Sequence, residues 1–320
     1  TLKSLSNLAD ATLGAVLNLA RSEIEERGHA LPAGVRLAVL GLGRLGYREL
    51  DYESDLDLIF LHEGADQTGT RVLTSRWCET MVRLLSTLSQ DGQLYRVDLR
   101  LRPSGREGDL VPSFEGLRDY FQRTAEVWEL QAFLKARPVA GDLELGARAV
   151  GEIEAVVLDR AARLGQETIV SEVGAMRSRL QQGTGGRRGG ARSLKLAPGG
   201  IFDVHFSIEL LQLRHAVRSP QDKDTLRLLT HLNALGWLSE RHLAALYEGY
   251  LFLRALEHAM RLVHDRPLGA LPSDAARLRD LALAMEDEGM EGLSGERLID
   301  LHRRHTATVR AACESILGAS

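Results

Sequence analysis

The spacing between a glycine-rich stretch and a pair of aspartates most constrains what this chain can fold into. The apolar run VRLAVL leads into GLGRLG, and only eight residues separate Gly46 from Asp55. GLGRLG matches the G-x-G-x-x-G pattern of dinucleotide-binding proteins, but that pattern also requires a helix directly after the glycines. A parallel strand-helix-strand crossover usually takes at least about 10 to 12 residues. The connection is too short for that fold, so we predict an antiparallel or mixed sheet.

Hydrophobic periodicity predicts the elements around this connection. An apolar stripe at helical spacing indicates a helix over residues 4–26. Strict alternation of apolar and polar residues indicates a half-buried strand over 94–102. Between them, the same patterns predict two strands and one helix, at about 35–40, 56–61 and 70–90 respectively.

From Ser113 onward the pattern is helical nearly to the end of the chain. The sequence therefore divides into a mixed part and an all-helical part. We predict the α+β class with two domains. The first is a small mixed-sheet domain with an N-terminal helix over 1–142, and the second is a helical bundle over 143–320.

Composition and charge argue against several classes of protein. The net charge of −4 gives no overall attraction to nucleic acid or to an anionic membrane, so neither is expected as a partner. No apolar run approaches the ~18 residues of a membrane span. Cys78 and Cys313 form no C-x-x-C pattern, which fits a cytoplasmic location. Because the chain opens on a helix and does not begin with Met, we expect a segment of a longer protein.

The aspartates after the glycines point to metal chemistry. Asp55 and Asp57 leave the same face of the predicted strand, because alternate residues of a strand share a face. Two adjacent carboxylates repel each other and are costly at the edge of a core unless a cation lies between them. Mg²⁺ prefers oxygen ligands and is usually held by one or two carboxylates and substrate phosphates. Asp98 adds a carboxylate on the next predicted strand, so we expect these three to hold Mg²⁺.

Basic residues accompany Asp98 on the same face of its strand, at Arg96, Arg100 and Arg102. Carboxylates that hold metal, arginines and a glycine loop together indicate phosphoryl or nucleotidyl transfer, because the arginines neutralise the phosphates. The alternative is that the D-x-D and D-x-R motifs are solvated strand ends without a ligand.

Three motifs in this order carry a family resemblance: GRLG at 43–46, SDLDL at 54–58 and YRVDLRLRP at 95–103. They resemble the nucleotidyltransferase core of the polymerase-β-like superfamily and, more narrowly, the glutamine synthetase adenylyltransferase family. Further matches continue downstream, in WELQAFLKARPVAGD at 128–142, LKLAPGGIFDVHF at 194–206 and FLRALEHAMRLVHDRPLGALP at 252–272. The resemblance identifies residues 1–142 as a nucleotidyltransferase domain.

The resemblance implies a Mg²⁺-dependent enzyme that uses ATP and modifies a tyrosine of glutamine synthetase. It also implies control by a PII signalling protein and by glutamine. Family members usually contain two catalytic halves, one that attaches AMP and one that removes it with phosphate to give ADP. This chain holds one set of motifs, and its downstream segments look more like the C-terminal, adenylylating half. The removing half and a non-catalytic docking or regulatory copy remain alternatives.

The resemblance also implies roles for individual residues. Asp55, Asp57 and Asp98 are expected to be catalytic and metal-binding, with Asp98 assisting the attacking hydroxyl. Nucleotide binding is expected from glycine, hydroxyl and basic residues, namely Gly43, Arg44, Gly46, Ser54, Arg100, Arg102 and Lys195. Two positions depart from the family pattern. Arg44 stands where the family usually has Lys, which alters phosphate geometry, and His205 stands where the family has Glu.

Overall fold

The computed structural model describes residues 2–64, 68–88, 90, 92–105, 107–185, 193–264, 270–286, 289–290 and 292–318. The chain forms two compact units, Thr1–Arg160 and Ala161–Ser320, and each is described by itself. The division between the units falls inside helix α6 (Leu143–Leu164), whereas the domain boundary expected from the sequence lies just before this helix, after residue 142, and stays a prediction.

The first unit is built on a four-stranded sheet in the order β3-β2-β1-β4. Its strands are β1 (Arg36–Gly41), β2 (Leu56–Glu63), β3 (Val97–Asp98) and β4 (Arg137–Gly141). Strand β1 pairs antiparallel with both β2 and β4, whereas β2 and β3 run parallel. The sheet is therefore mixed, as the short connection after the glycines predicts, and it is not the all-parallel sheet of a dinucleotide-binding fold.

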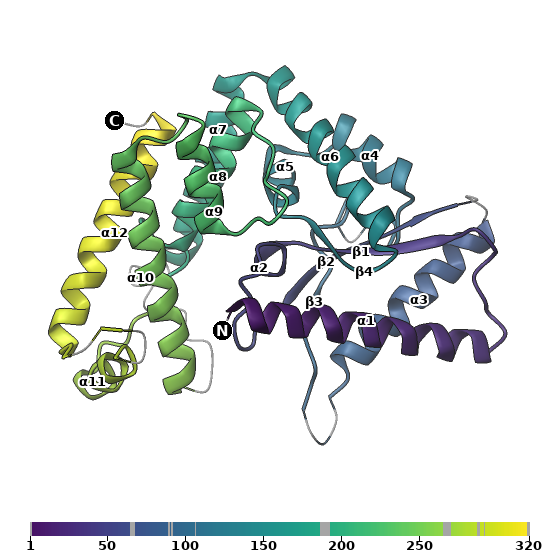
Figure 1. Ribbon diagram of the computed structural model, residues 1–320, viewed down its shortest axis with the longest axis horizontal. Coiled ribbons are helices and arrows are strands. Elements are labelled where there is room, and N and C mark those ends of the chain that lie inside the picture. Colours follow the sequence, from purple (N-terminus) through teal and green to yellow (C-terminus); the bar gives the residue numbers. More distant parts are fainter. Residues whose placement is uncertain are drawn as a thin grey trace. The chain divides into compact units, whose positions relative to one another are not determined.

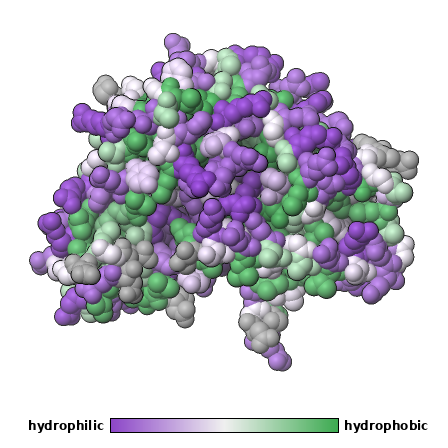
Figure 2. Space-filling model, viewed as in Figure 1, coloured by the Kyte–Doolittle hydropathy of each residue, from purple (hydrophilic) through white to green (hydrophobic). Residues whose placement is uncertain are grey.

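Helices cover both faces of this sheet (Figure 1). They are α1 (Leu2–Glu26), α2 (Gly43–Gly46), α3 (Thr68–Ser86), α4 (Phe114–Arg123), α5 (Val127–Phe133) and α6. Helices α1 and α3 lie on one face, and their apolar sides form one core with β1 and β2. The outer surface of α1 carries interspersed hydrophobic and hydrophilic residues (Figure 2), including the exposed Leu8 and Leu19.

The alternation of side chains along the strands explains the two layers. Leu56 and Leu58 of β2 are fully buried in the core beneath α1 and α3. Asp57, between them, leaves the opposite face, as the period of two requires. The strand thus places one partly buried carboxylate opposite two leucines.

The prediction of a strand over 94–102 is wrong in its length. Within this range only Val97 and Asp98 pair in the sheet, as strand β3. The side chain of Asp98 accepts a hydrogen bond from the backbone N–H of Arg100 at 2.9 Å. A local bond of this kind offers the backbone an alternative to the sheet ladder. The next residues form turns, in which Arg102 N–H donates to Leu99 O and Gly105 N–H donates to Arg102 O.

The second unit is built mainly of helices, with an isolated β-bridge between Ser193 and Ala270. Its helices are α7 (Gln166–Gly185), α8 (Ile201–His215), α9 (Thr225–Ala234), α10 (Glu240–His264), α11 (Ala275–Ala284) and α12 (Gly295–Leu317). Helix α8 is buried along most of its length and packs against α7, α9, α10 and α12.

The α+β class with a following helical domain is confirmed. In the described parts of both units, no helix is long and apolar enough to span a membrane.

Hydrogen bonds to Asp203 hold the N-terminal part of α8 in place. Asp203 is buried and accepts two hydrogen bonds from the guanidinium of Arg177, each at 2.7 Å. It also accepts the backbone N–H of Gly199 at 2.7 Å. Gly199 has a φ of 80°, and a Cβ there would lie 1.8 Å from the carbonyl oxygen of Thr306 on α12. The PGG turn at 198–200 therefore requires glycine because α12 passes so close.

A pair of glycine substitutions in the first unit tests whether close backbone contacts there also require glycine. Gly141 ends β4 with a φ of 80°, and an added Cβ would lie 2.4 Å from Leu37 O. Gly141→Ala should destabilise the protein by at least about 1 kcal/mol, because an L-residue is strained at this φ. Gly151→Ala lies inside α6 with open space around it, and should stabilise by about 0.5 to 1 kcal/mol. Urea unfolding measures the free energy of unfolding of both variants. Equal changes in the two variants would show that the positive φ and close contact of Gly141 do not require glycine.

Candidate active site

The glycine turn after β1 lies directly on Asp57. Gly43 opens α2 with a φ of 54°, and a Cβ at this position would lie only 2.1 Å from Asp57 Oδ2. The backbone N–H of Leu42 donates to Asp57 O at 2.9 Å. The turn and the carboxylate can approach this closely only because residue 43 has no side chain.

The sheet brings the three aspartates together. Asp57 and Asp98 are paired in register on the neighbouring parallel strands β2 and β3. Asp55 lies two residues before Asp57, just outside β2. The pKa of Asp57 is raised to about 6, mainly by burial and also by repulsion from Asp98 and Asp55, against the lowering effect of Lys135 and Arg100. These electrostatic effects show that the three carboxylates share one locality, as the sequence predicts.

Arginines neutralise two of these carboxylates. The side chain of Asp55 is half exposed and accepts a hydrogen bond from Arg96 Nε at 2.7 Å. Asp98 accepts from Arg100 Nε at 3.0 and 2.9 Å. Asp57, between them, carries the raised pKa.

The donor set fits Mg²⁺ in its chemistry, because it offers carboxylate oxygens from two adjacent strands. It does not form a ready-made metal cage: in the described part of the chain, no group of three or more His, Cys, Asp and Glu residues is positioned to hold a metal ion. Arg96 and Arg100 supply the positive charge that balances Asp55 and Asp98. Metal binding to all three aspartates would therefore require these ion pairs to loosen.

The other predicted nucleotide ligands of the first unit lie around the turn and the strand ends. Arg44 is a partly buried residue of α2. A Cβ on Gly46 would lie 2.1 Å from Lys135 O, so this glycine also permits a close backbone approach. Ser54 Oγ accepts the backbone N–H of Asp51 at 3.1 Å, in the turn that precedes β2. Arg102 Nη1 donates to Leu99 O at 3.4 Å.

Lys195 and His205 belong to the second unit. Lys195 Nζ lies 3.7 Å from Glu257 Oε1, in a cluster in which Glu257 also pairs with Arg254 and Arg261. The expected role of Lys195 in nucleotide binding stays a prediction. His205 is buried in α8, and its Nε2 lies 3.3 Å from the Thr225 hydroxyl of α9. This position is part of the packing between helices.

Lys135 is a residue of the site that the sequence reasoning did not single out. It lies two residues before the start of β4, its carbonyl group faces Gly46, and its positive charge lowers the pKa of Asp57. Its Nζ lies 5.5 Å from the ring centroid of Tyr47. A signal was present in the sequence, since Lys135 is one of only four lysines in the chain and lies within a motif shared with the family.

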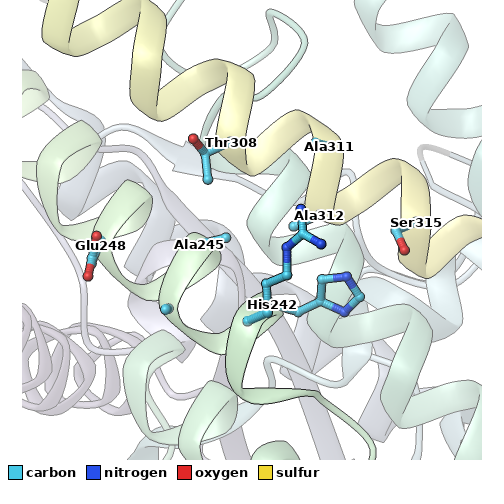
Figure 3. Close-up of a pocket in the computed structure, with 9 residues that line it drawn as sticks. His242, Ala245, Glu248, Thr308, Ala311, Ala312 and Ser315 are labelled. Carbon is cyan, nitrogen blue, oxygen red and sulfur yellow. The ribbon is translucent and has the colours of Figure 1, made fainter.

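A shallow groove of about 330 Å³ lies between α10 and α12 in the second unit (Figure 3). Its lining includes four alanines and the charged or polar residues Arg241, His242 and Glu248. None of the predicted site residues lines it. The residues of the groove are therefore not among the predicted site residues.

Comparisons with known proteins agree with the motifs. Residues 1–152 match the glutamate-ammonia ligase adenylyltransferase family, and residues 174–317 match the PII-uridylyltransferase family.

Curated relatives named bifunctional glutamine synthetase adenylyltransferase/adenylyl-removing enzyme are similar over most of the chain. That of Streptomyces avermitilis is 37% identical over 324 residues, 99% of this chain and 31% of the relative. That of Streptomyces coelicolor is 39% identical over 328 residues, again 99% and 31%. That of Mycobacterium avium is 40% identical over 285 residues, 88% and 27%. The chain thus spans under a third of the length of these relatives.

The raised pKa of Asp57 predicts a pH-dependent stability. Because the pKa is about 6 in the folded protein and 3.8 in the reference state, ionisation of Asp57 destabilises the fold above pH 6. This cost disappears as the pH falls through 6 towards 4. In metal-free buffer, Asp57→Asn should therefore raise the free energy of unfolding by up to about 3 kcal/mol at pH 8 and leave it nearly unchanged at pH 4. The exposed Asp109→Asn is the control, and an effect of Asp57→Asn that is independent of pH would refute the prediction.

A second substitution tests the contact between the turn and the carboxylate. Gly43→Ala should destabilise the protein by roughly 1 to 2 kcal/mol because of its positive φ, and it should also displace Asp57 Oδ2. The thermal shift expected from ATP and Mg²⁺ in the wild-type protein should therefore disappear in this variant. Gly14→Ala, in open space on α1, is the control and should retain the full shift. Retention of the shift by Gly43→Ala would show that the contact does not form the ligand site.

Proposed function

Because the chain belongs to the glutamine synthetase adenylyltransferase family, we propose that it carries a nucleotidyltransferase site that transfers AMP from ATP to a tyrosine of glutamine synthetase. The observation that supports this most strongly is the in-register pair of Asp57 and Asp98 with the glycine turn against Asp57. This arrangement joins carboxylates, which can bind a metal, to a backbone turn that a phosphate group can approach.

Asp55, Asp57 and Asp98 would hold Mg²⁺, which neutralises the phosphates of ATP when bound. The chemical step forms a bond between the tyrosine oxygen and the α-phosphorus of ATP. It breaks the bond from that phosphorus to the bridging oxygen, so that pyrophosphate leaves with the bonding electron pair. Asp98 is proposed to accept the proton of the tyrosine hydroxyl, which a positioned carboxylate can do as a general base.

Positive side chains of the first unit are proposed to orient the phosphates. Arg100 is exposed and its guanidinium already lies against a carboxylate of the site, so it can exchange that partner for a phosphate oxygen. Lys135 and Arg44 lie around the glycine turn, and Arg102 follows β3. Arginine suits this role because its planar group can make two parallel bonds to a phosphate.

We assign the chain to the adenylylating half on the basis of its sequence, because its downstream segments resemble the C-terminal half of the family. The removing reaction is the second candidate. It uses phosphate to release AMP as ADP, and the same three aspartates serve both directions. A PII signalling protein and glutamine are proposed as regulators from the family resemblance, and the cytoplasm as the location.

The assignment predicts label transfer. With labelled ATP, Mg²⁺ and unmodified glutamine synthetase, the chain should transfer AMP to the synthetase. Asp98→Asn should lower the rate at least 1000-fold, about 4 kcal/mol of barrier, while the protein stays folded. Asp109→Asn is the matched control, since its exposed carboxylate pairs only weakly with Arg71 at 3.7 Å.

Two further measurements separate the alternatives. Rapid release of ADP from modified synthetase and phosphate, without forward labelling, would reverse the direction. A docking copy would show neither reaction and no stabilisation by ATP and Mg²⁺, although a bound ligand at 100 times its dissociation constant should stabilise by about 2.7 kcal/mol.

A further inference from the structure

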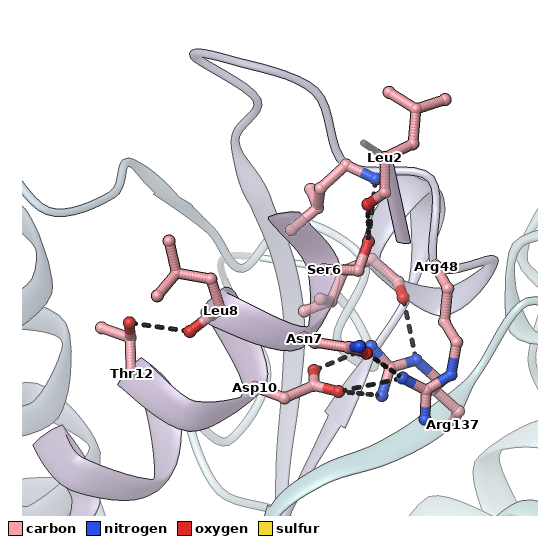
Figure 4. A network of polar contacts seen from close by, with 10 residues as sticks. Leu2, Ser6, Asn7, Leu8, Asp10, Thr12, Arg48 and Arg137 are labelled. Carbon is pink, nitrogen blue, oxygen red and sulfur yellow. Dashed lines mark hydrogen bonds and ion pairs between the residues drawn. The ribbon is translucent and has the colours of Figure 1, made fainter. Parts of the chain in front are cut away.

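A buried ion pair ties the glycine turn to the N-terminal helix (Figure 4). Arg137, the first residue of β4, is buried, and its Nε donates to Leu45 O of α2 at 2.9 Å. Its two terminal nitrogens donate to the two carboxylate oxygens of Asp10 on α1, at 2.8 and 2.7 Å. One guanidinium thus uses all three of its donor nitrogens to join α1 to α2.

The same part of α1 makes further polar contacts with the residues that follow the turn. Arg48 Nη1 donates to Asn7 Oδ1 at 2.9 Å and approaches Asp10 Oδ2 at 3.4 Å. Arg48 has a φ of 57°, a conformation that costs free energy in a residue other than glycine and that persists only where its surroundings hold it. Leu50 N–H donates to Ser6 Oγ at 3.0 Å. One turn of α1 therefore holds residues 45–50 from one side.

The glycines of the turn contact Asp57 and Lys135. Asp57 Oδ2 leaves no room for a side chain at Gly43, and Lys135 O leaves none at Gly46. A shift of α2 away from β4 would change the position of Gly43 relative to Asp57. The chain of contacts runs from Asp10 through Arg137 and the Leu45 carbonyl to the turn and the carboxylate.

We propose that Asp10 and Arg137 are positioning residues, which hold the glycine turn against Asp57 and so make α1 part of the machinery that orients the nucleotide phosphates. Neither residue lies among the predicted ligands, and both act through the Leu45 carbonyl. This inference rests on the proposed nucleotidyl transfer for its kinetic consequence, but its structural part, the fixation of residues 43–46, does not. An ion pair that merely joins α1 to the sheet would affect only stability.

The chain offers a matched control for that distinction. Arg36 lies at the far end of β1 from the turn and pairs with Glu63 and Asp142. Its substitution weakens another ion-pair cluster, one that is more exposed (38% of the Arg36 side chain against 10% of the Arg137 side chain), without touching the turn. Arg36→Lys and Arg137→Lys both keep the positive charge, but lysine cannot reproduce the fork of arginine donors.

The experiment has a kinetic readout and a structural one. Arg137→Lys should lower kcat/KM for ATP at least tenfold, with a raised KM, whereas Arg36→Lys should leave both near wild type. Asp10→Asn, at a less buried position, should act in the same direction as Arg137→Lys and serves if that variant does not fold. Equal kcat/KM losses in Arg36→Lys and Arg137→Lys at equal melting temperature would overturn the inference, as would wild-type kinetics in Arg137→Lys and Asp10→Asn.

Hydrogen exchange of the ligand-free protein provides the test that is independent of activity. The amide of Gly46 donates to Leu42 O at 2.9 Å, and its exchange should become at least tenfold faster in Arg137→Lys, with β1 amides still protected. Unchanged exchange would overturn the inference even if transfer is observed. Faster exchange in a protein whose wild type transfers no AMP would instead support the positioning role and refute the proposed function.

Discussion

The contact between Gly43 and Asp57 is the constraint on which the site depends. Strands β1 and β2 pair antiparallel, so the chain leaving β1 at Gly41 passes the start of β2 and must turn beside it. The turn can contact the carboxylate of Asp57 only because Gly43 lacks a side chain and tolerates a φ of 54°. The G-x-G-x-x-G pattern therefore has a different physical basis here from the dinucleotide-binding loop. In that loop the glycines admit a pyrophosphate next to a long helix, whereas here they admit a carboxylate next to a short turn.

Electrostatics determine what this geometry can do. Placing Asp98 in register with Asp57 on a parallel strand brings two negative charges together at a partly buried position, and burial raises the pKa of Asp57 to about 6. Asp55 and Asp98 are balanced by Arg96 and Arg100. A site with this balance suits a ligand that brings both positive and negative charge, as a metal-nucleotide complex would. Asp55, Asp57 and Asp98 would then hold the cation, and Arg96 and Arg100 would be released to bind phosphate oxygens.

The polar network of Figure 4 connects a helix from the beginning of the chain to the glycine turn beside the candidate site. Asp10 and Arg137 form a bidentate pair with little exposure, and breaking such a pair leaves an uncompensated buried charge. The network therefore resists small displacements of α1. A change that repositions α1 would reach the turn through the Leu45 carbonyl and through the contacts of Arg48 and Leu50 with α1.

Local rules are sufficient for part of this protein. The spacing of eight residues after Gly46 predicts the mixed sheet, and the period of two places Asp57 opposite Leu56 and Leu58, because both arguments involve neighbours along one strand or one short connection. The length of β3 could not be predicted from alternation, since the side chain of Asp98 bonds the backbone of Arg100 and competes with the ladder. The role of Lys135 and the pair of Arg137 with Asp10, 127 residues apart, were decided only by the tertiary structure. The order of strands in the sheet, which brings β4 beside β1 and beneath α1, creates these contacts, and no local pattern encodes that order.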